Sequence, residues 1–151
     1  MRPKTFRAAT EADTEALAVR LAEHCRVGVV YLHGALGSGK TSLVRAWLRA
    51  RGHTGAVRSP TYTLLETYAI EGVSAAHLDL YRLADPAEVE YLGVRELGGN
   101  ATALVFIEWP EHGAGFLPPP DLRITIEIDS SARKFFIEPE SPAAGRCVAA
   151  L

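Results

Sequence analysis

Cysteine is scarce in this sequence, and long hydrophobic runs and a dominant charge are missing. The two cysteines, Cys25 and Cys147, lie far apart and have no partners at metal-binding spacing, which favours buried or free thiols over a ligand set. No apolar run approaches the length of a membrane span. Charged residues also interrupt residues 1–12, where a signal peptide needs an apolar stretch. We therefore expect a cytoplasmic protein that does not enter a membrane.

The charge balance gives no sign of a strongly charged partner, although it leaves a local basic patch open. The net charge is only −2, so no strong field of one sign points to nucleic acid or an anionic lipid surface. The 151 residues are 48% hydrophobic, which is ordinary for a globular protein with one real core. We expect a single domain over residues 1–151, in which residues 138–151 form a loose tail or a short helix.

The most informative stretch runs from Gly34 to Thr41 and reads Gly-Ala-Leu-Gly-Ser-Gly-Lys-Thr. It has the pattern G-x-x-x-x-G-K-[ST], it follows the apolar run 29–32, and it precedes a segment with helical periodicity. Glycines permit backbone conformations in which successive N–H groups point at phosphate oxygens. A helix that begins at Lys40 adds its own unpaired N–H groups. The alternative, a glycine turn before a surface lysine, is disfavoured by the strand and helix flanks.

This stretch predicts a site for the phosphates of a nucleotide. Lys40 is expected to bridge the β- and γ-phosphates, and the Thr41 hydroxyl is expected to hold Mg²⁺. The residues expected to contact the nucleotide here are Gly34, Leu36, Gly37, Ser38, Gly39, Lys40, Thr41 and Ser42.

The segments around this stretch predict an α/β protein. Thr10 is a plausible N-cap for a helix that ends near Arg26. A second helix follows Lys40 and stops at Gly52, with Arg45, Arg49 and Arg51 expected on a solvated face.

Strand patterns dominate the rest of the chain. Residues 62–70 and 75–81 are expected to form an antiparallel hairpin. The continuous apolar run 103–107 is typical of a central strand covered on both faces. Residues 122–128 alternate like an edge-type strand, paired with residues 134–138. Residues 93–100 are expected to be a connection.

Two acidic residues follow or end predicted strands. Glu108 comes directly after four apolar residues, and the carboxyl end of such a strand faces the phosphates in an open α/β sheet. Glu108 is therefore expected to hold Mg²⁺, although an ordinary polar residue at a strand end is the alternative. Alternation places Asp79 on one face with His77 and Tyr81. Asp79 then orients the attacking water or touches Mg²⁺ through water, or belongs to a structural hydrogen-bond cluster. His77 alone is more often a packed histidine.

Two absences in the sequence narrow the predictions of the nucleotide and of how water is positioned. The chain contains no glutamine, so water positioned by a glutamine is excluded. Its only asparagine, Asn100, is followed by Ala-Thr, so the guanine-reading Asn-Lys-x-Asp is absent and ATP is favoured over GTP. Thr61, in Ser-Pro-Thr, lies where many hydrolases have a loop that senses the γ-phosphate. Arg82 and Arg95 are the candidates for an arginine finger, but neither is clearly placed as one.

Four motifs together resemble one known family. They are the phosphate loop, Ser-Pro-Thr-Tyr-Thr-Leu at 59–64, His-Leu-Asp-Leu-Tyr-Arg-Leu at 77–83 and Glu-Trp-Pro at 108–110. In this order and spacing, over about residues 29–122, they resemble the TsaE (YjeE) family, small ATPases of tRNA threonylcarbamoyladenosine synthesis.

The resemblance implies a P-loop NTPase fold with a mixed, mostly parallel central sheet flanked by helices. It implies ATP and Mg²⁺ as cofactors, weak hydrolysis by the protein alone, and activation by a TsaB–TsaD heterodimer. It also implies that hydrolysis resets that complex between turnovers, and that the protein contacts tRNA only as part of the complex. By the same match Lys40, Asp79 and Glu108 are needed for hydrolysis, Thr41 and Glu108 bind the metal, and Trp109 lies near the nucleotide with Thr61.

One departure from the family pattern concerns the phosphate loop. Ala35 stands where the family commonly has Asp, so any catalytic role of that acid is lost and Asp79 and Glu108 remain. Arg133, after Asp129-Ser-Ser, is expected to approach the adenine or ribose.

Two alternative functions stay open. A small-molecule kinase passes the γ-phosphate to an acceptor, but no segment has the composition of an arginine-bearing lid. A nucleotide-dependent binding switch, in which hydrolysis is incidental, is the other.

Overall fold

The computed structural model describes residues 1–26, 28–98 and 103–151. The connection expected at residues 93–100 was wrong for its described part, because Val94–Gly98 forms a short helix, and its last residues lie outside the described ranges. Its elements, in which η marks a 3₁₀ helix, are β1 Lys4–Ala8, α1 Glu11–His24, β2 Gly28–His33, α2 Lys40–Ala50, β3 Leu65–Ile70, β4 Val73–Asp79, η1 Pro86–Leu92, α3 Val94–Gly98, β5 Ala103–Glu108, η2 Pro110–Gly113, β6 Leu122–Asp129, β7 Ala132–Pro139 and α4 Pro142–Ala149.

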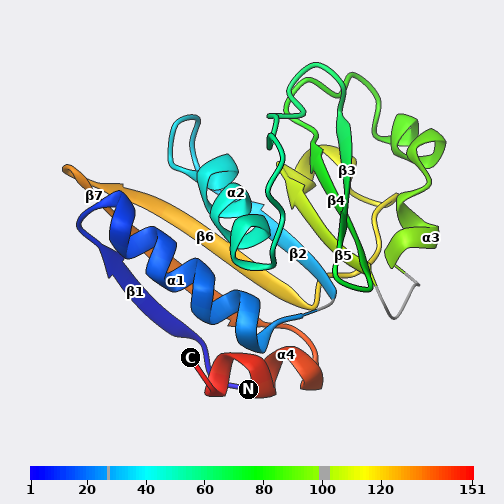
Figure 1. Cartoon of the computed structure of the whole chain (residues 1–151). Helices are drawn as coiled ribbons and strands as arrows, with labels where there is room; N and C mark the ends of the chain where they lie inside the picture. Colours follow the sequence, from blue (N-terminus) through cyan, green and yellow to red (C-terminus); the bar gives the residue numbers. More distant parts are fainter. Residues whose placement is uncertain (27, 99–102) are drawn as a thin grey trace.

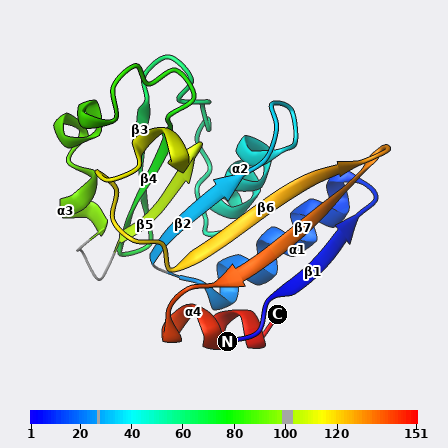
Figure 2. The same cartoon turned by 180° about the vertical axis from the view of Figure 1, so that it is seen from behind.

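The described strands form one seven-stranded sheet in the order β1-β7-β6-β2-β5-β4-β3. The central strands β6, β2, β5 and β4 run parallel to their neighbours among these four, whereas β3, β7 and β1 pair antiparallel. This arrangement confirms the predicted mixed, mostly parallel sheet. Figures 1 and 2 show the sheet from its two sides, with α1 and α2 lying together across one face.

Two apolar clusters hold the layers together. The larger one lies between the sheet and helices α1, α2 and α4, and it contains Leu21, Trp47 and Phe106. The smaller one covers the other face of β4 and β5 and contains Val89 and Val94 from η1 and α3. All six residues of β5 are buried, which confirms the predicted central strand.

The first helix follows its sequence signals. Thr10 caps α1 by accepting a hydrogen bond from the Asp13 backbone N–H, and the Asp13 side chain accepts from the Thr10 N–H in return. The helix ends at His24, close to the predicted end. The predicted hairpin is also present, but β3 begins at Leu65 because the Leu64 N–H bonds to the Pro60 carbonyl in a turn.

The prediction of an edge-type strand at residues 122–128 was wrong. Strand β6 lies inside the sheet, between β2 and β7, and the free edges are β1 and β3. The alternation in β6 reflects one buried face, with Leu122, Ile124 and Ile126 inside, and a second face that is only partly covered. The edge strand β1 was not expected from the sequence.

Two other expectations are resolved by the structure. Arg51 is not on a solvated face, because the turn after α2 buries it and its guanidinium donates to the Arg26 carbonyl oxygen. The C-terminal segment forms helix α4, which Ser141 caps and whose Ala144 and Val148 are buried. Among the described residues, no helix is both long and apolar enough to cross a membrane.

Helix α1 provides a matched test of the larger core. Leu21 is fully buried, whereas Val19 on the same helix is 46% exposed. We expect Leu21→Ala to lower the free energy of unfolding by about 2–5 kcal/mol, because it removes buried area and leaves a cavity. Val19→Ala, the control, is expected to change it by less than about 0.5 kcal/mol. Urea denaturation measures both values, and equal losses would contradict the assigned packing.

Candidate functional site

The loop between β2 and α2 has the geometry of a phosphate cradle. A Cβ atom on Gly34 would lie 2.5 Å from the Ser38 Oγ and 2.8 Å from the Ile126 carbonyl oxygen, so only glycine fits there. Gly39 occupies the N-cap of α2 with a φ of 109°, a left-handed conformation that glycine adopts easily. No side chain in the described ranges caps α2, so N–H groups in its first turn remain available to a ligand.

Lys40 reaches across this loop. Its ammonium donates to the carbonyl oxygens of Gly34 and, at 3.0 Å, Ala35, and lies 4.5 Å from the centre of the Trp109 ring. Only 5% of the residue is exposed. Burial lowers the pKa of Lys40 below its usual value, while the carboxylates of Glu108 and Asp79 partly offset that shift. The loop thus holds a buried cation where phosphate oxygens would need one.

One buried polar atom in the loop has no partner. The Ser38 hydroxyl is shielded from solvent and makes no hydrogen bond within the described residues. Arg133 from β7 donates to the Ser38 carbonyl oxygen at 3.0 Å and holds the loop from the other side. A shielded hydroxyl without a hydrogen-bond partner among the described residues marks this loop as a place where a polar partner is missing.

The two predicted acids lie next to each other at the ends of neighbouring strands. In the parallel pair β4 and β5, Asp79 is opposite Glu108. Both residues are buried and share the sheet face that α2 covers. The Thr41 hydroxyl, in the first turn of α2, donates to Glu108 Oε2 at 2.9 Å. The structure therefore brings together the three side chains that the sequence assigned to metal and hydrolysis.

His77 joins this group more closely than the sequence suggested. It is fully buried on β4, and its Nε2 hydrogen bonds to Glu108 Oε2. The sequence favoured a packed histidine, and the ring is indeed buried. It also contacts the Glu108 carboxylate, which the sequence did not predict.

Asp79 links the sheet to the loop that precedes β3. Its Oδ1 accepts from the Tyr81 backbone N–H at 3.0 Å, and its Oδ2 lies 3.4 Å from the donating Thr61 hydroxyl. Thr61 also bonds to the Ser59 hydroxyl at 2.7 Å. The expected γ-phosphate loop thus lies beside Asp79, within reach of the same site.

An aromatic stack closes the site beside Lys40. Trp109 has a positive φ of 56°, which turns the chain directly after Glu108. Its ring lies 5.5 Å from His112 and 5.0 Å from Tyr81, measured between centroids. Sequence reasoning missed His112, because only the turn at Pro110 brings it back over the strand end and no spacing signals that.

A groove of about 710 Å³ adjoins the loop. Residues from the start of α1, from α2 and from β7 line it, including Thr10, Ser42 and Arg133. Its volume is in the range of sites for small ligands.

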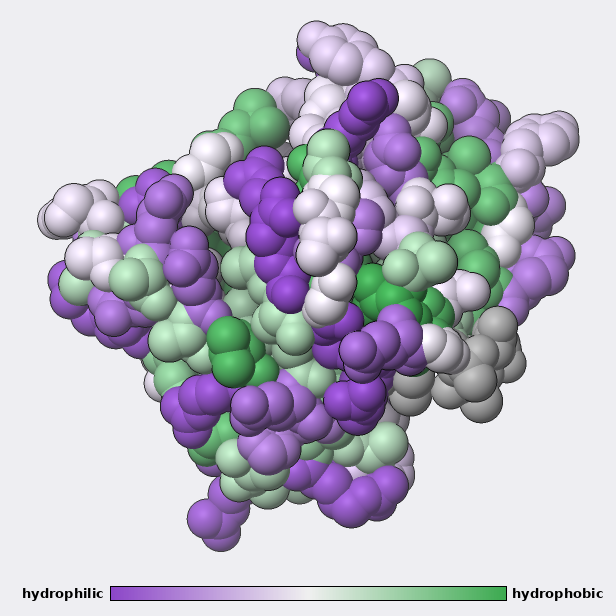
Figure 3. Space-filling model, in the orientation of Figure 1, coloured by the Kyte–Doolittle hydropathy of each residue, from purple (hydrophilic) through white to green (hydrophobic). Residues whose placement is uncertain are grey.

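Hydrophilic residues are spread over the face of the molecule that carries α1 and α2, with hydrophobic ones in small patches between them (Figure 3). Leu36, by contrast, is exposed at the outside of the loop.

The residues fit Mg²⁺ when it arrives with a nucleotide. Mg²⁺ prefers oxygen ligands and usually combines one or two carboxylates with waters and phosphate oxygens. Thr41 and Glu108 offer a hydroxyl and a carboxylate in contact. Within the described ranges, no group of three or more His, Cys, Asp or Glu side chains is arranged to hold a metal ion by itself. The site therefore suits a metal that shares its ligands with phosphates.

Comparison with known proteins agrees with the sequence resemblance. A family model described as threonylcarbamoyl adenosine biosynthesis protein TsaE matches residues 8–135. The chain is 50% identical over 105 residues to the tRNA threonylcarbamoyladenosine biosynthesis protein TsaE of Haemophilus influenzae, covering 70% of this chain and 66% of that protein. It is 35% identical over 129 residues to the Aquifex aeolicus protein of the same name, covering 83% and 88%.

A solved structure has the same fold. The crystal structure of YdiB from Bacillus subtilis superposes with a TM-score of 0.82, covers 98% of this chain and 93% of its own, and is 22% identical. At that identity the likeness concerns the fold alone. The match to the family model extends over most of the sequence, and the first of these relatives shares half of its aligned residues, so this chain belongs to the TsaE family.

Proposed function

We propose that this chain binds and hydrolyses ATP with Mg²⁺ in the synthesis of threonylcarbamoyladenosine on tRNA. The curated relatives carry that biosynthetic role in their names. The observation that carries the proposal is the contact between the Thr41 hydroxyl and Glu108 Oε2, at the mouth of the glycine loop. It joins a helix N-terminus that attracts phosphate to a carboxylate that attracts a cation.

The chain's own residues suggest how the triphosphate is held. The phosphates enter the loop and accept from its backbone N–H groups, and the Lys40 ammonium exchanges its carbonyl partners for β- and γ-phosphate oxygens. Bound Mg²⁺ supplies charge neutralisation between these phosphates. Thr41 and Glu108 are the residues that hold it, and Asp79 orients the attacking water beside Thr61.

The nucleoside belongs in the adjoining groove. That groove opens directly from Gly37 to Gly39, so a nucleotide whose phosphates occupy the loop extends its ribose and base into it. Arg133 both lines the groove and bonds to the loop, so it contacts the nucleotide from the β7 side.

In the described part of the chain, neither predicted arginine-finger candidate contacts the phosphate loop. Arg82 lies 4.6 Å from the centre of the Tyr62 ring, and Arg95 donates to the Gly115 carbonyl oxygen. Both candidates are thus engaged outside the phosphate loop. Hydrolases without such a group are slow, and one supplied by a partner raises the rate by roughly 10³–10⁵. This supports activation by a TsaB–TsaD heterodimer, with tRNA met only through that complex.

Lys40 gives the first test. We expect Lys40→Ala to weaken ATP binding at least about tenfold and to abolish hydrolysis, because it removes the buried cation that faces the phosphates. Fluorescent nucleotide titration measures binding, and phosphate release measures hydrolysis. Lys134→Ala is the matched control, because Lys134 follows Arg133 on β7 and points to the opposite face. Full turnover in Lys40→Ala would refute the site.

Glu108 gives the second test. We expect Glu108→Gln to raise the Mg²⁺ concentration needed for half-maximal hydrolysis at least about tenfold, because an amide is a weaker ligand than a carboxylate. The amide oxygen can still accept from Thr41 and His77, so the free energy of unfolding changes far less than with Glu108→Ala. An unchanged Mg²⁺ requirement would move the ligand role to Asp79.

The partner gives the third test. With γ-labelled ATP, we expect added TsaB–TsaD to raise phosphate release by this chain at least about tenfold. Release that TsaB–TsaD leaves unchanged would contradict partner activation and favour a binding switch. Label transferred to a small acceptor instead would favour a kinase.

A further inference from the structure

His77 is an unusual residue for its position in the sheet. It lies on β4 between Ala75 and Asp79, on the face that packs against the larger apolar cluster, and it is fully buried. An apolar side chain of similar size would fill the same space without burying polar nitrogen atoms. The residue type therefore calls for a polar explanation.

The polar explanation is its contact with Glu108. A carboxylate oxygen accepts hydrogen bonds and does not donate them, so His77 Nε2 is the donor to Glu108 Oε2. The Thr41 hydroxyl donates to the same oxygen at 2.9 Å. Two donors from different elements, one on the sheet and one on α2, thus converge on Oε2, and Oε1 remains for other partners.

The backbone register makes this contact possible. His77 is opposite Phe106 in the parallel pair of β4 and β5, two positions before the pair formed by Asp79 and Glu108. Glu108 is the last residue of β5, so its side chain is not held from beyond the strand end. His77 approaches from the neighbouring strand and fixes the carboxylate against the N-terminus of α2.

We propose that His77 is a positioning residue that orients the Glu108 carboxylate toward Thr41 for the Mg²⁺–nucleotide complex. This inference rests on the proposed function and assigns a role to a side chain outside the metal ligands themselves. Hydrogen-bonding partners behind a metal ligand commonly change metal affinity by 10–100-fold when they are removed. His77 does not touch the nucleotide, so it acts on metal affinity and leaves metal-free nucleotide binding unchanged.

Three variants separate positioning from packing. In His77→Gln the amide nitrogen reaches about where Nε2 lies, so the donor to Glu108 is retained. In His77→Asn the amide nitrogen lies nearer the Nδ1 position and cannot reach the carboxylate. His77→Leu fills the space without any donor.

The measurement is the affinity for Mn²⁺, a paramagnetic substitute for Mg²⁺, in the presence of a non-hydrolysable ATP analogue. Free Mn²⁺ is followed by electron paramagnetic resonance with the full chain. We expect Asn and Leu to weaken Mn²⁺ binding about 10–100-fold, and Gln to stay within a few-fold of the unsubstituted protein. Analogue binding in the presence of EDTA is expected to be equal in all four proteins.

Two outcomes of the Mn²⁺ measurement would overturn the inference. Unchanged Mn²⁺ affinity in Asn and Leu would show that His77 does not position Glu108. An equal loss in Gln and Leu would show a packing role only. If Leu does not fold, the comparison of Gln with Asn decides. Failure of the unsubstituted protein to bind Mn²⁺ with the analogue would instead refute the proposed function, before any variant is compared.

Discussion

The contact between the Thr41 hydroxyl and the Glu108 carboxylate is the constraint on which the rest of the site depends. It exists only because two parallel strands, β2 and β5, end at the same edge of the sheet and α2 starts directly above them. The left-handed conformation at Gly39 starts the helix there. The buried strand β5 fixes where its last residue lies, because all six of its residues pack on both faces. A small shift of either element would separate the hydroxyl from the carboxylate, so the apolar clusters on both faces support the site directly.

The loop is arranged before any ligand arrives. Lys40 is buried and satisfied by loop carbonyl oxygens, and Arg133 ties the Ser38 carbonyl oxygen to β7. A buried ammonium without partners would be costly, so these carbonyl contacts hold the lysine in place. Burial lowers the pKa of Lys40, and the carboxylates of Glu108 and Asp79 partly offset that shift. On phosphate binding, as proposed, Lys40 would exchange carbonyl oxygens for phosphate oxygens as its partners. The phosphate does not have to order a mobile lysine, which reduces the entropic cost of binding.

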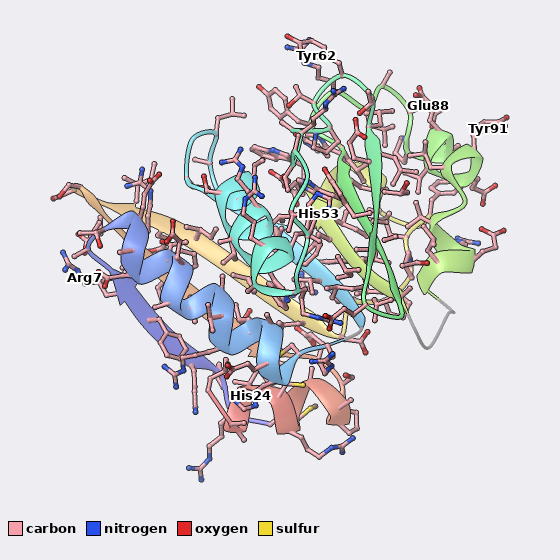
Figure 4. The ribbon with its side chains drawn as sticks, viewed as in Figure 1. Arg7, His24, His53, Tyr62, Glu88 and Tyr91 are labelled. Atoms are coloured by element: carbon pink, nitrogen blue, oxygen red, sulfur yellow. The ribbon has the colours of Figure 1, made fainter. Side chains whose placement is uncertain are left out.

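Local patterns in the sequence predicted the phosphate loop, the capped helix α1, the hairpin and the central strand, because each depends on neighbouring residues. The same patterns marked Asp79 and Glu108 as candidates for the site, but the pairing of β4 with β5 that places them opposite each other was not predicted. They did not predict β1, whose pairing with β7 joins residues at opposite ends of the sequence. Without β1, the strand at residues 122–129 looked closer to the edge than it is. The partners of His77 and the stacking of His112 on Trp109 also depend on tertiary folding that no spacing encodes. Exposed aromatic side chains such as Tyr62 and Tyr91, at the end of the molecule that carries β3 and η1 (Figure 4), carry no local signal of their role either.

The charges of the site give a reason for its expected dependence on a divalent cation. Lys40 contributes one positive charge, and the buried Glu108 and Asp79 contribute two negative ones beside it. A free triphosphate that enters the loop would bring further negative charge next to these carboxylates, in surroundings that screen charge poorly. A divalent cation held by Thr41 and Glu108, as proposed, would offset that repulsion. Metal and nucleotide should therefore strengthen each other's binding by the same factor, as thermodynamic linkage requires. In this proposal the two carboxylates would favour the metal complex over the bare nucleotide.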